Sequence, residues 1–91
     1  MNTTSTPHQV TVYSKPSCVQ CTMTYRKLDN AGISYIVVDV TEDEDAVAFI
    51  KDQLGYLTAP VVFVSEDLHW GGFRPDLIEG LAATLAATNA A

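Results

Sequence analysis

Short apolar runs and helically spaced apolar residues alternate along this chain, and together they predict strands and helices in turn. An apolar run at Gln9–Tyr13 predicts a first strand. A helical pattern follows it, with Ser17 as a plausible N-cap and Gly32 as the C-terminal stop. The apolar positions of this helix recur at helical spacing: Cys21, Tyr25, Leu28 and Ala31.

The middle of the chain predicts a second strand and a second helix. Tyr35–Val40 is apolar on both faces until Asp39, which is typical of a central strand in a parallel sheet. The helix between the two strands is then expected to form a right-handed crossover. Thr41-Glu42-Asp43-Glu44 predicts a capping box at the start of a second helix, which Gly55 ends. The acidic run Glu42–Asp45 is explained by helix capping and solubility, with a partner-docking patch as the alternative. The buried stripe of this helix would be Ala46, Val47, Ile50 and Leu54.

The last third of the chain predicts a hairpin and a helix. Val61–Val64 and Leu68–Gly71 are strand-like runs separated by a turn at Ser65-Glu66-Asp67, so we expect an antiparallel pair. Pro75 fits the first position of a last helix. The apolar face of that helix would be Leu77, Ile78, Leu81 and Leu85. The order β-α-β-α-β-β-α predicts an α/β protein with the minimal thioredoxin/glutaredoxin fold, a four-stranded mixed sheet with three helices.

Composition and charge place the chain in a broad class. With 91 residues, 47% of them apolar and 18% charged, it is expected to be one globular domain. We expect a loose arm at residues 1–8, the domain at 9–85 and an alanine-rich tail at 86–91. No window approaches the about 18 apolar residues of a membrane span, and the N-terminus lacks the pattern of a signal peptide, so we expect a cytoplasmic protein. The net charge of −6 argues against binding to nucleic acid.

The two cysteines, in Cys18-Val19-Gln20-Cys21, stand where the first strand is expected to turn into the first helix. Residues three apart share one face of a helix, so the two sulfurs can approach to bonding distance. Cytosolic thiols are kept reduced, and there a cysteine pair is more often catalytic or metal-binding than structural. A Cys-x-x-Cys motif at this place is typical of a thioredoxin-like redox centre.

The expected helix gives the two thiols different roles. Cys18 would lie in the first turn, where free N–H groups and the helix dipole lower a thiol pKa and supply the nucleophilic thiolate. Lys15 would add positive charge. Cys21 would lie one turn deeper, where burial favours the neutral thiol. We therefore expect Cys18 to attack a partner's disulfide and Cys21 to resolve the mixed disulfide.

Two other interpretations of the cysteine pair stay open. The thiols could be structural, or they could bind metal. A structural zinc site requires four ligands. Besides the cysteines, only His8 and His69 are soft donors, and their spacing matches no recognisable zinc motif. Cys18 from two chains could instead help to hold zinc or an iron–sulfur cluster. No Gly-rich phosphate turn is present, so we expect no bound nicotinamide.

Thr58-Ala59-Pro60 precedes the third strand. A proline there can simply be an edge residue. In the expected fold, however, a cis-proline lies opposite the dithiol, so we expect Pro60 to be cis. The backbone of Ala59 would then be free to pair with an extended segment of a partner.

Trp70-Gly71-Gly72-Phe73-Arg74-Pro75-Asp76 is the other informative stretch. Its glycines suggest a tight turn before the last helix, and Phe73 is expected to fill the core. We expect Trp70, next to His69 on a short strand, to be partly exposed, where it could anchor a protein partner.

Three separated segments together resemble the NrdH-redoxin family, over about residues 9–85. They are Tyr13-Ser14-Lys15-Pro16-Ser17-Cys18-Val19-Gln20-Cys21, Gly55-Tyr56-Leu57-Thr58-Ala59-Pro60-Val61 and the Trp70–Asp76 stretch. Members of this family are glutaredoxin-like proteins with thioredoxin-like activity. The resemblance implies a redox-active Cys18–Cys21 disulfide. We also expect a monomer with no bound cofactor. The resemblance further implies electron transfer to the large subunit of class Ib ribonucleotide reductase, with NADPH-dependent thioredoxin reductase restoring the dithiol.

The residues and the resemblance together indicate which positions contact partners. They are Lys15, Thr58, Ala59, cis Pro60, Trp70, Gly71, Gly72, Phe73 and Arg74. The chain departs from the family at Gly71, where serine is common.

Glutathione-dependent glutaredoxins are the close rival. They typically carry an aromatic residue between the cysteines and a pair of acidic residues after two glycines, which together hold glutathione. Here Val19 and Gln20 lie between the cysteines, and Gly71-Gly72 is followed by Phe73-Arg74-Pro75, so that Asp76 stands alone where the acidic pair is expected. A glutaredoxin that uses glutathione or another small thiol is the second hypothesis, and a metal or iron–sulfur binding module is the third.

Overall fold

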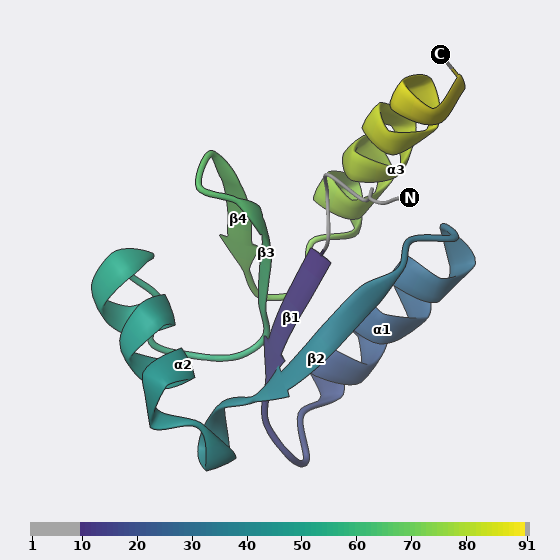
Figure 1. Ribbon diagram of the computed structural model, residues 1–91. Helices are drawn as coiled ribbons and strands as arrows, with labels where there is room; N and C mark the ends of the chain where they lie inside the picture. The colour runs from purple at the N-terminus through teal and green to yellow at the C-terminus, as the bar shows by residue number, and fades with distance from the viewer. Residues whose placement is uncertain (1–9, 91) are drawn as a thin grey trace.

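Four strands form one mixed sheet in the computed structural model, which describes residues 10–90 (Figure 1). The strand order is β2-β1-β3-β4. β1 (Val10–Ser14) runs parallel to β2 (Tyr35–Asp39) and antiparallel to β3 (Val61–Ser65), which pairs antiparallel with β4 (Leu68–Gly71). The predicted fold class and the predicted hairpin are therefore confirmed.

Helices cover both faces of the sheet (Figure 1). α1 (Val19–Asn30) and α3 (Pro75–Ala90) pack on one face, where Leu28 and Ile78 join the main core. α2 (Glu44–Ala48) continues into the π-helical turn η2 (Phe49–Gln53) on the other face. Alternation along β1 explains this division, because Val10 and Val12 face the main core while the Tyr13 ring lies 5.8 Å from that of Phe49.

The second strand lies at the edge of the sheet, so its predicted central position is wrong although its parallel pairing is right. Ile36 and Val37 are 46% and 50% exposed. An edge strand can be apolar on both faces, and apolar content alone does not report how many neighbours a strand has.

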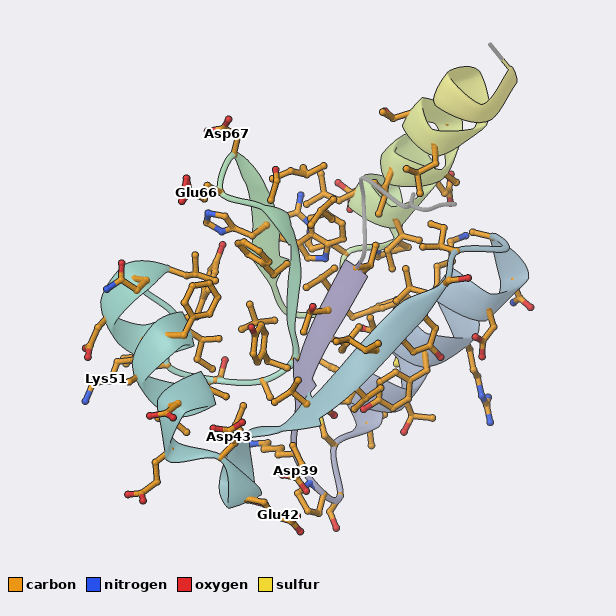
Figure 2. The ribbon with its side chains drawn as sticks, viewed as in Figure 1. Asp39, Glu42, Asp43, Lys51, Glu66 and Asp67 are labelled. Atoms are coloured by element: carbon orange, nitrogen blue, oxygen red, sulfur yellow. A yellow bond between two sulfur atoms is a disulfide. The ribbon has the colours of Figure 1, made fainter. Side chains whose placement is uncertain are left out.

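The first two helices begin later than predicted. Ser17 has a left-handed φ of 56°, and Cys18 is the N-cap of α1. The capping box at Thr41–Glu44 is also wrong. The hydroxyl and the N–H of Thr41 both donate to Asp39, which caps a short 3₁₀ turn, η1 (Val40–Glu42). Asp43 then caps α2 by accepting from the N–H of Ala46 at 3.0 Å. Figure 2 shows Asp39, Glu42 and Asp43 close to the C-terminal end of β2.

Burial along the later helices follows most of the predicted pattern. Ala46 and Ile50 are buried and Leu54 is half-buried, but Val47 is 39% exposed. In α3 the predicted apolar face is confirmed, with Ile78 and Leu81 fully inside. α3 continues as far as Ala90, past the point where the sequence pattern fades, and an ion pair of 2.9 Å joins its Glu79 to Lys27 of α1. The predicted arm at residues 1–8 and the predicted strand start at Gln9 lie outside the described residues.

Trp70 is buried, which overturns the expectation that it is partly exposed. It is 4% exposed and belongs to the main core. The physical reason is the register of the hairpin: Trp70 lies opposite Val62, which also contributes to the core that α1 and α3 cover. Phe73 is partly buried against the same core, as expected. No helix within residues 10–90 is long and apolar enough to cross a membrane.

Replacing Trp70 by phenylalanine should mainly lower stability. The smaller ring leaves unfilled space in the core, so we expect the free energy of unfolding to fall by about 2 kcal/mol in chemical denaturation. Leu68→Ala, on an exposed position of the same strand, is the control and should cost less than about 1 kcal/mol. Equal losses in the two variants would contradict the burial of Trp70.

Candidate functional site

Cys18 and Cys21 form a disulfide at the start of α1, with their Cα atoms 5.2 Å apart. The turn at Lys15–Ser17, with its left-handed Ser17, leads the chain from the end of β1 into the N-cap position. Two residues at the start of one helix are thereby held close enough to bond. This places a redox-capable pair where the sequence predicts it.

The start of α1 favours negative charge on Cys18. The N–H of Cys21 donates to Cys18 Sγ at 3.1 Å, so the sulfur itself caps the helix. Unpaired N–H groups and the helix dipole stabilise an anion at this position. Cys18 lies at the N-cap and not within the first turn as predicted, but the physical reason for expecting a thiolate is the same.

The two sulfur residues differ in access. Cys21 is 1% exposed, whereas Cys18 is half-buried at a surface depression of about 390 Å³. Lys15, Val19 and Tyr25 line the same depression. Tyr25 is fixed there by a hydrogen bond between its hydroxyl and that of the buried Ser14. Of the two cysteines, Cys18 is therefore the more accessible from this side.

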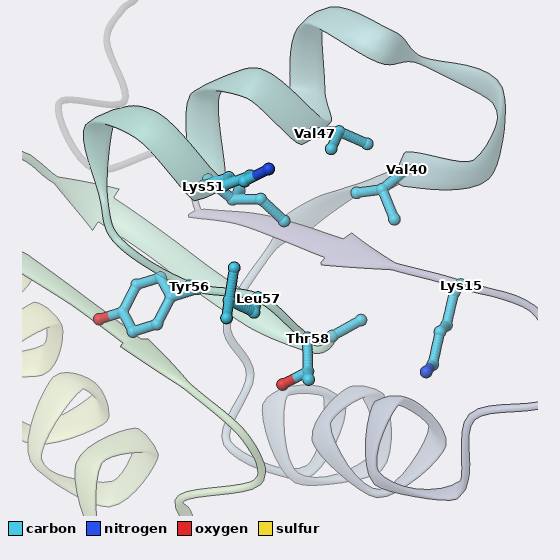
Figure 3. Close-up of a pocket in the computed structure, with 9 residues that line it drawn as sticks. Lys15, Val40, Val47, Lys51, Tyr56, Leu57 and Thr58 are labelled. Atoms are coloured by element: carbon cyan, nitrogen blue, oxygen red, sulfur yellow. The ribbon is translucent and has the colours of Figure 1, made fainter.

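A second apolar surface, which we call the groove, lies between α2 and the segment that leads to β3. It has a volume of about 310 Å³. Figure 3 shows Tyr56 at one end of it and Lys15 at the other. Its lining residues come from four parts of the chain: Lys15, Val40, Val47, Ile50, Lys51, Tyr56, Leu57, Thr58 and Ala59. Lys15 lines both the groove and the depression at Cys18, so the two surfaces adjoin.

Pro60 has the predicted cis peptide bond, and its ring is buried. Its carbonyl accepts a hydrogen bond from the N–H of Gly72 at 2.7 Å. Gly72 has a φ of 82°, a conformation that strongly favours glycine. The turn before α3 is thereby tied to the start of β3.

Gln20 is the residue of this site that sequence reasoning missed. Its Oε1 accepts from the N–H of Phe73 at 3.2 Å and so joins the cysteine motif to the turn before α3. Nothing in the local spacing points to a partner 53 residues away. The only available signal was a polar residue between the two cysteines.

The remaining predicted partner residues are only partly brought together. Trp70 lies in the core and offers no surface, and Gly71 is covered by the ring of Tyr56. Arg74 is exposed, and its guanidinium donates twice to Asp76, with Nη2 to Oδ2 at 2.9 Å. The hydrogen bond from Arg74 lowers the pKa of Asp76 below its ordinary value.

Within residues 10–90, no group of three or more His, Cys, Asp or Glu side chains lies together as a metal site would require. His8, one of the two candidate donors, lies outside that range.

Comparison with known proteins gives a consistent picture. A family model described as Glutaredoxin matches residues 10–70. The chain is 40% identical over 81 residues to the glutaredoxin-like protein NrdH of Salmonella typhimurium, covering 89% of this chain and 98% of that protein. It is 37% identical over 73 residues to the NrdH protein of Escherichia coli, covering 80% of this chain and 88% of that one. The solved structure of the glutaredoxin-like protein NrdH-redoxin from Escherichia coli aligns with a TM-score of 0.75 and 37% identity, covering 80% of this chain and 93% of that chain. That protein is described as having a thioredoxin-like activity profile.

Removing the Gln20 amide should loosen the turn before α3. In Gln20→Ala the N–H of Phe73 loses its acceptor, so we expect its hydrogen–deuterium exchange to become about tenfold faster. Gln20→Glu keeps an oxygen at the same place and should restore slow exchange. Equal exchange rates in the wild type and both variants would show that this contact does not hold the turn.

Proposed function

The chain belongs to the glutaredoxin-like NrdH proteins of the glutaredoxin family and is therefore a thiol–disulfide oxidoreductase and electron carrier. On this basis, we propose that its clients are enzymes of ribonucleotide reduction. In this proposal it reduces the large subunit of class Ib ribonucleotide reductase. Thioredoxin reductase then restores the dithiol with electrons from NADPH, so the carrier binds no cofactor itself. The observation that carries the proposal is the Cys18–Cys21 disulfide at a helix start, with Cys18 half-buried and Cys21 fully buried.

The reaction would proceed by two exchanges. The Cys18 thiolate attacks one sulfur of the partner's disulfide, a mixed disulfide forms, and the partner's other sulfur leaves as a thiolate that takes up a proton. Cys21 then loses its proton and attacks Cys18 Sγ, and the partner's second thiolate leaves. Two electrons pass to the partner, and the carrier ends with the Cys18–Cys21 disulfide.

The surfaces around Cys18 are suited to an extended protein segment. Leu57 and Val19, which are 81% and 74% exposed, offer apolar side chains near the groove and the depression. We propose that the backbone of Ala59 pairs with the partner in the manner of an added strand, with Lys15 and Thr58 beside it. Gly72, Phe73 and Arg74 would form the far rim. We further propose that the protein works as a monomer in the cytoplasm.

A glutathione-dependent glutaredoxin is the second candidate, and one observation favours it. Lys15 and Lys51 both line the groove, and two cations beside an apolar surface suit a small thiol with carboxylates. Against it, Asp76, the acidic residue expected to receive the amino end of such a ligand, forms an ion pair with Arg74. This pairing makes the protein-disulfide carrier the better supported function.

A coupled assay separates the two candidates. We expect NADPH oxidation to follow protein-disulfide reduction when thioredoxin reductase is supplied, and little turnover with glutathione and glutathione reductase. The reason is that the glutathione site lacks a free acidic contact. Turnover with the glutathione system alone would overturn the proposed function.

The two cysteines should also behave differently as traps. Cys21→Ser leaves the attacking thiol and removes the escape thiol, so a covalent mixed disulfide with ribonucleotide reductase should accumulate on non-reducing gels. Cys18→Ser is the matched control and should trap nothing. An adduct formed by Cys18→Ser and not by Cys21→Ser would reverse the assigned roles.

A further inference from the structure

Tyr56 joins two parts of the fold that are separate in the sequence. Its backbone N–H donates to the carbonyl of Ile50 in η2 at 2.7 Å. Its hydroxyl lies 2.8 Å from Nδ1 of His69 on β4, and the two rings meet edge to face at 5.6 Å. One residue is therefore fixed at its backbone by the helix and at its side chain by the sheet.

His69 is a firm attachment point for this side chain. It lies opposite Phe63 in the hairpin, and the two rings stack at 6.2 Å with an interplanar angle of 19°. Strand pairing holds its backbone and ring stacking holds its side chain. When the Tyr56 hydroxyl donates to Nδ1, the imidazole proton resides on Nε2.

Gly71 makes room for the Tyr56 ring. A Cβ placed on Gly71 would lie 3.1 and 3.3 Å from two carbons of the ring, closer than ordinary van der Waals contact. Gly71 does not have a left-handed φ, so packing against Tyr56 and not backbone strain is what a side chain there would disturb. The departure from serine at this position therefore has a local structural consequence.

The segment that begins at Tyr56 has no regular structure. Leu57, Thr58 and Ala59 lie outside any helix or strand, and Leu57 is 81% exposed. The same residues line the groove and lead directly to Pro60 (Figure 3). An anchor at Tyr56 thus fixes one end of the segment, and the buried Pro60 fixes the other.

We propose that Tyr56 is a positioning residue for substrate docking, which holds the Leu57–Ala59 segment in place through its bond to His69 and its seat on Gly71. This inference rests on the proposed docking of a partner segment along Ala59. Tyr56 does not touch the reacting sulfurs. Its effect is confined to substrates large enough to use the groove, whereas small disulfides need only Cys18.

The test compares a large and a small disulfide on the pre-reduced protein. Tyr56→Phe removes the hydroxyl and should lower the second-order rate constant with insulin about three- to tenfold, while that with the small reagent dithiobis(nitrobenzoate) stays within about twofold. Gly71→Ala, which pushes the ring away, should give the same pattern more weakly. In both variants the imidazole ¹⁵N signals of His69 should shift, because Nδ1 loses its donor.

Matched controls make the result specific. Tyr35→Phe removes a hydroxyl on β2, where burial and a hydrogen bond to Asp29 raise the pKa of Tyr35 to about 12. Gly80→Ala adds a methyl group in α3 where nothing lies within 4 Å. Neither control should change the insulin-to-reagent ratio.

Either of two results would overturn the proposal. One is an unchanged ratio in Tyr56→Phe, and the other is an equal fall with both disulfides, which would indicate a purely structural role. The assay contains neither thioredoxin reductase nor ribonucleotide reductase. It can therefore succeed or fail independently of the partners named above.

Discussion

The hydrogen bond from the Cys21 N–H to Cys18 Sγ is the interaction on which the rest of the site depends. A helix start needs an acceptor for its free N–H groups, and here the acceptor is the sulfur that would carry out the chemistry. A thiolate accepts such a bond better than a neutral thiol, because a charged acceptor strengthens a hydrogen bond. In the proposed reaction, the same contact would therefore cap the helix and stabilise the attacking thiolate. The left-handed turn at Ser17 delivers Cys18 to this position.

A few polar contacts then hold distant segments around that helix start. Gln20 reaches the N–H of Phe73, and Gly72 donates to the carbonyl of Pro60. Tyr56 performs a similar task on the opposite face, between η2 and β4. The contacts of Gln20 and Tyr56 join a segment without regular structure to a helix or strand, and the contact between Gly72 and Pro60 joins two such segments to each other. The buried core beneath them, which includes Trp70, supplies the rigid base from which these contacts can act.

The sequence predicts most of the fold because its signals are local. Apolar runs, Gly32 and Pro75 mark where strands and helices begin or end, and the cysteine spacing locates the redox pair. What escaped prediction depends on contacts between distant residues. The exposure of β2 follows from which strands neighbour it, and the burial of Trp70 follows from the hairpin register. The predicted cap at Thr41 does not form because the Thr41 hydroxyl donates to Asp39 instead. The sequence pattern does not show which of these two competing hydrogen bonds is preferred.

The asymmetry of the two thiols can be measured directly by alkylating the reduced wild-type protein across a range of pH and mapping each cysteine by mass spectrometry. The alkylation rate of Cys18 should reach half of its maximum at a pH below about 8.5, the value typical of an ordinary thiol. Cys21 should react slowly at every pH. Equal reactivity of the two thiols at every pH, or a Cys18 profile no different from that of a free cysteine, would contradict a capped and activated nucleophile beside a protected partner.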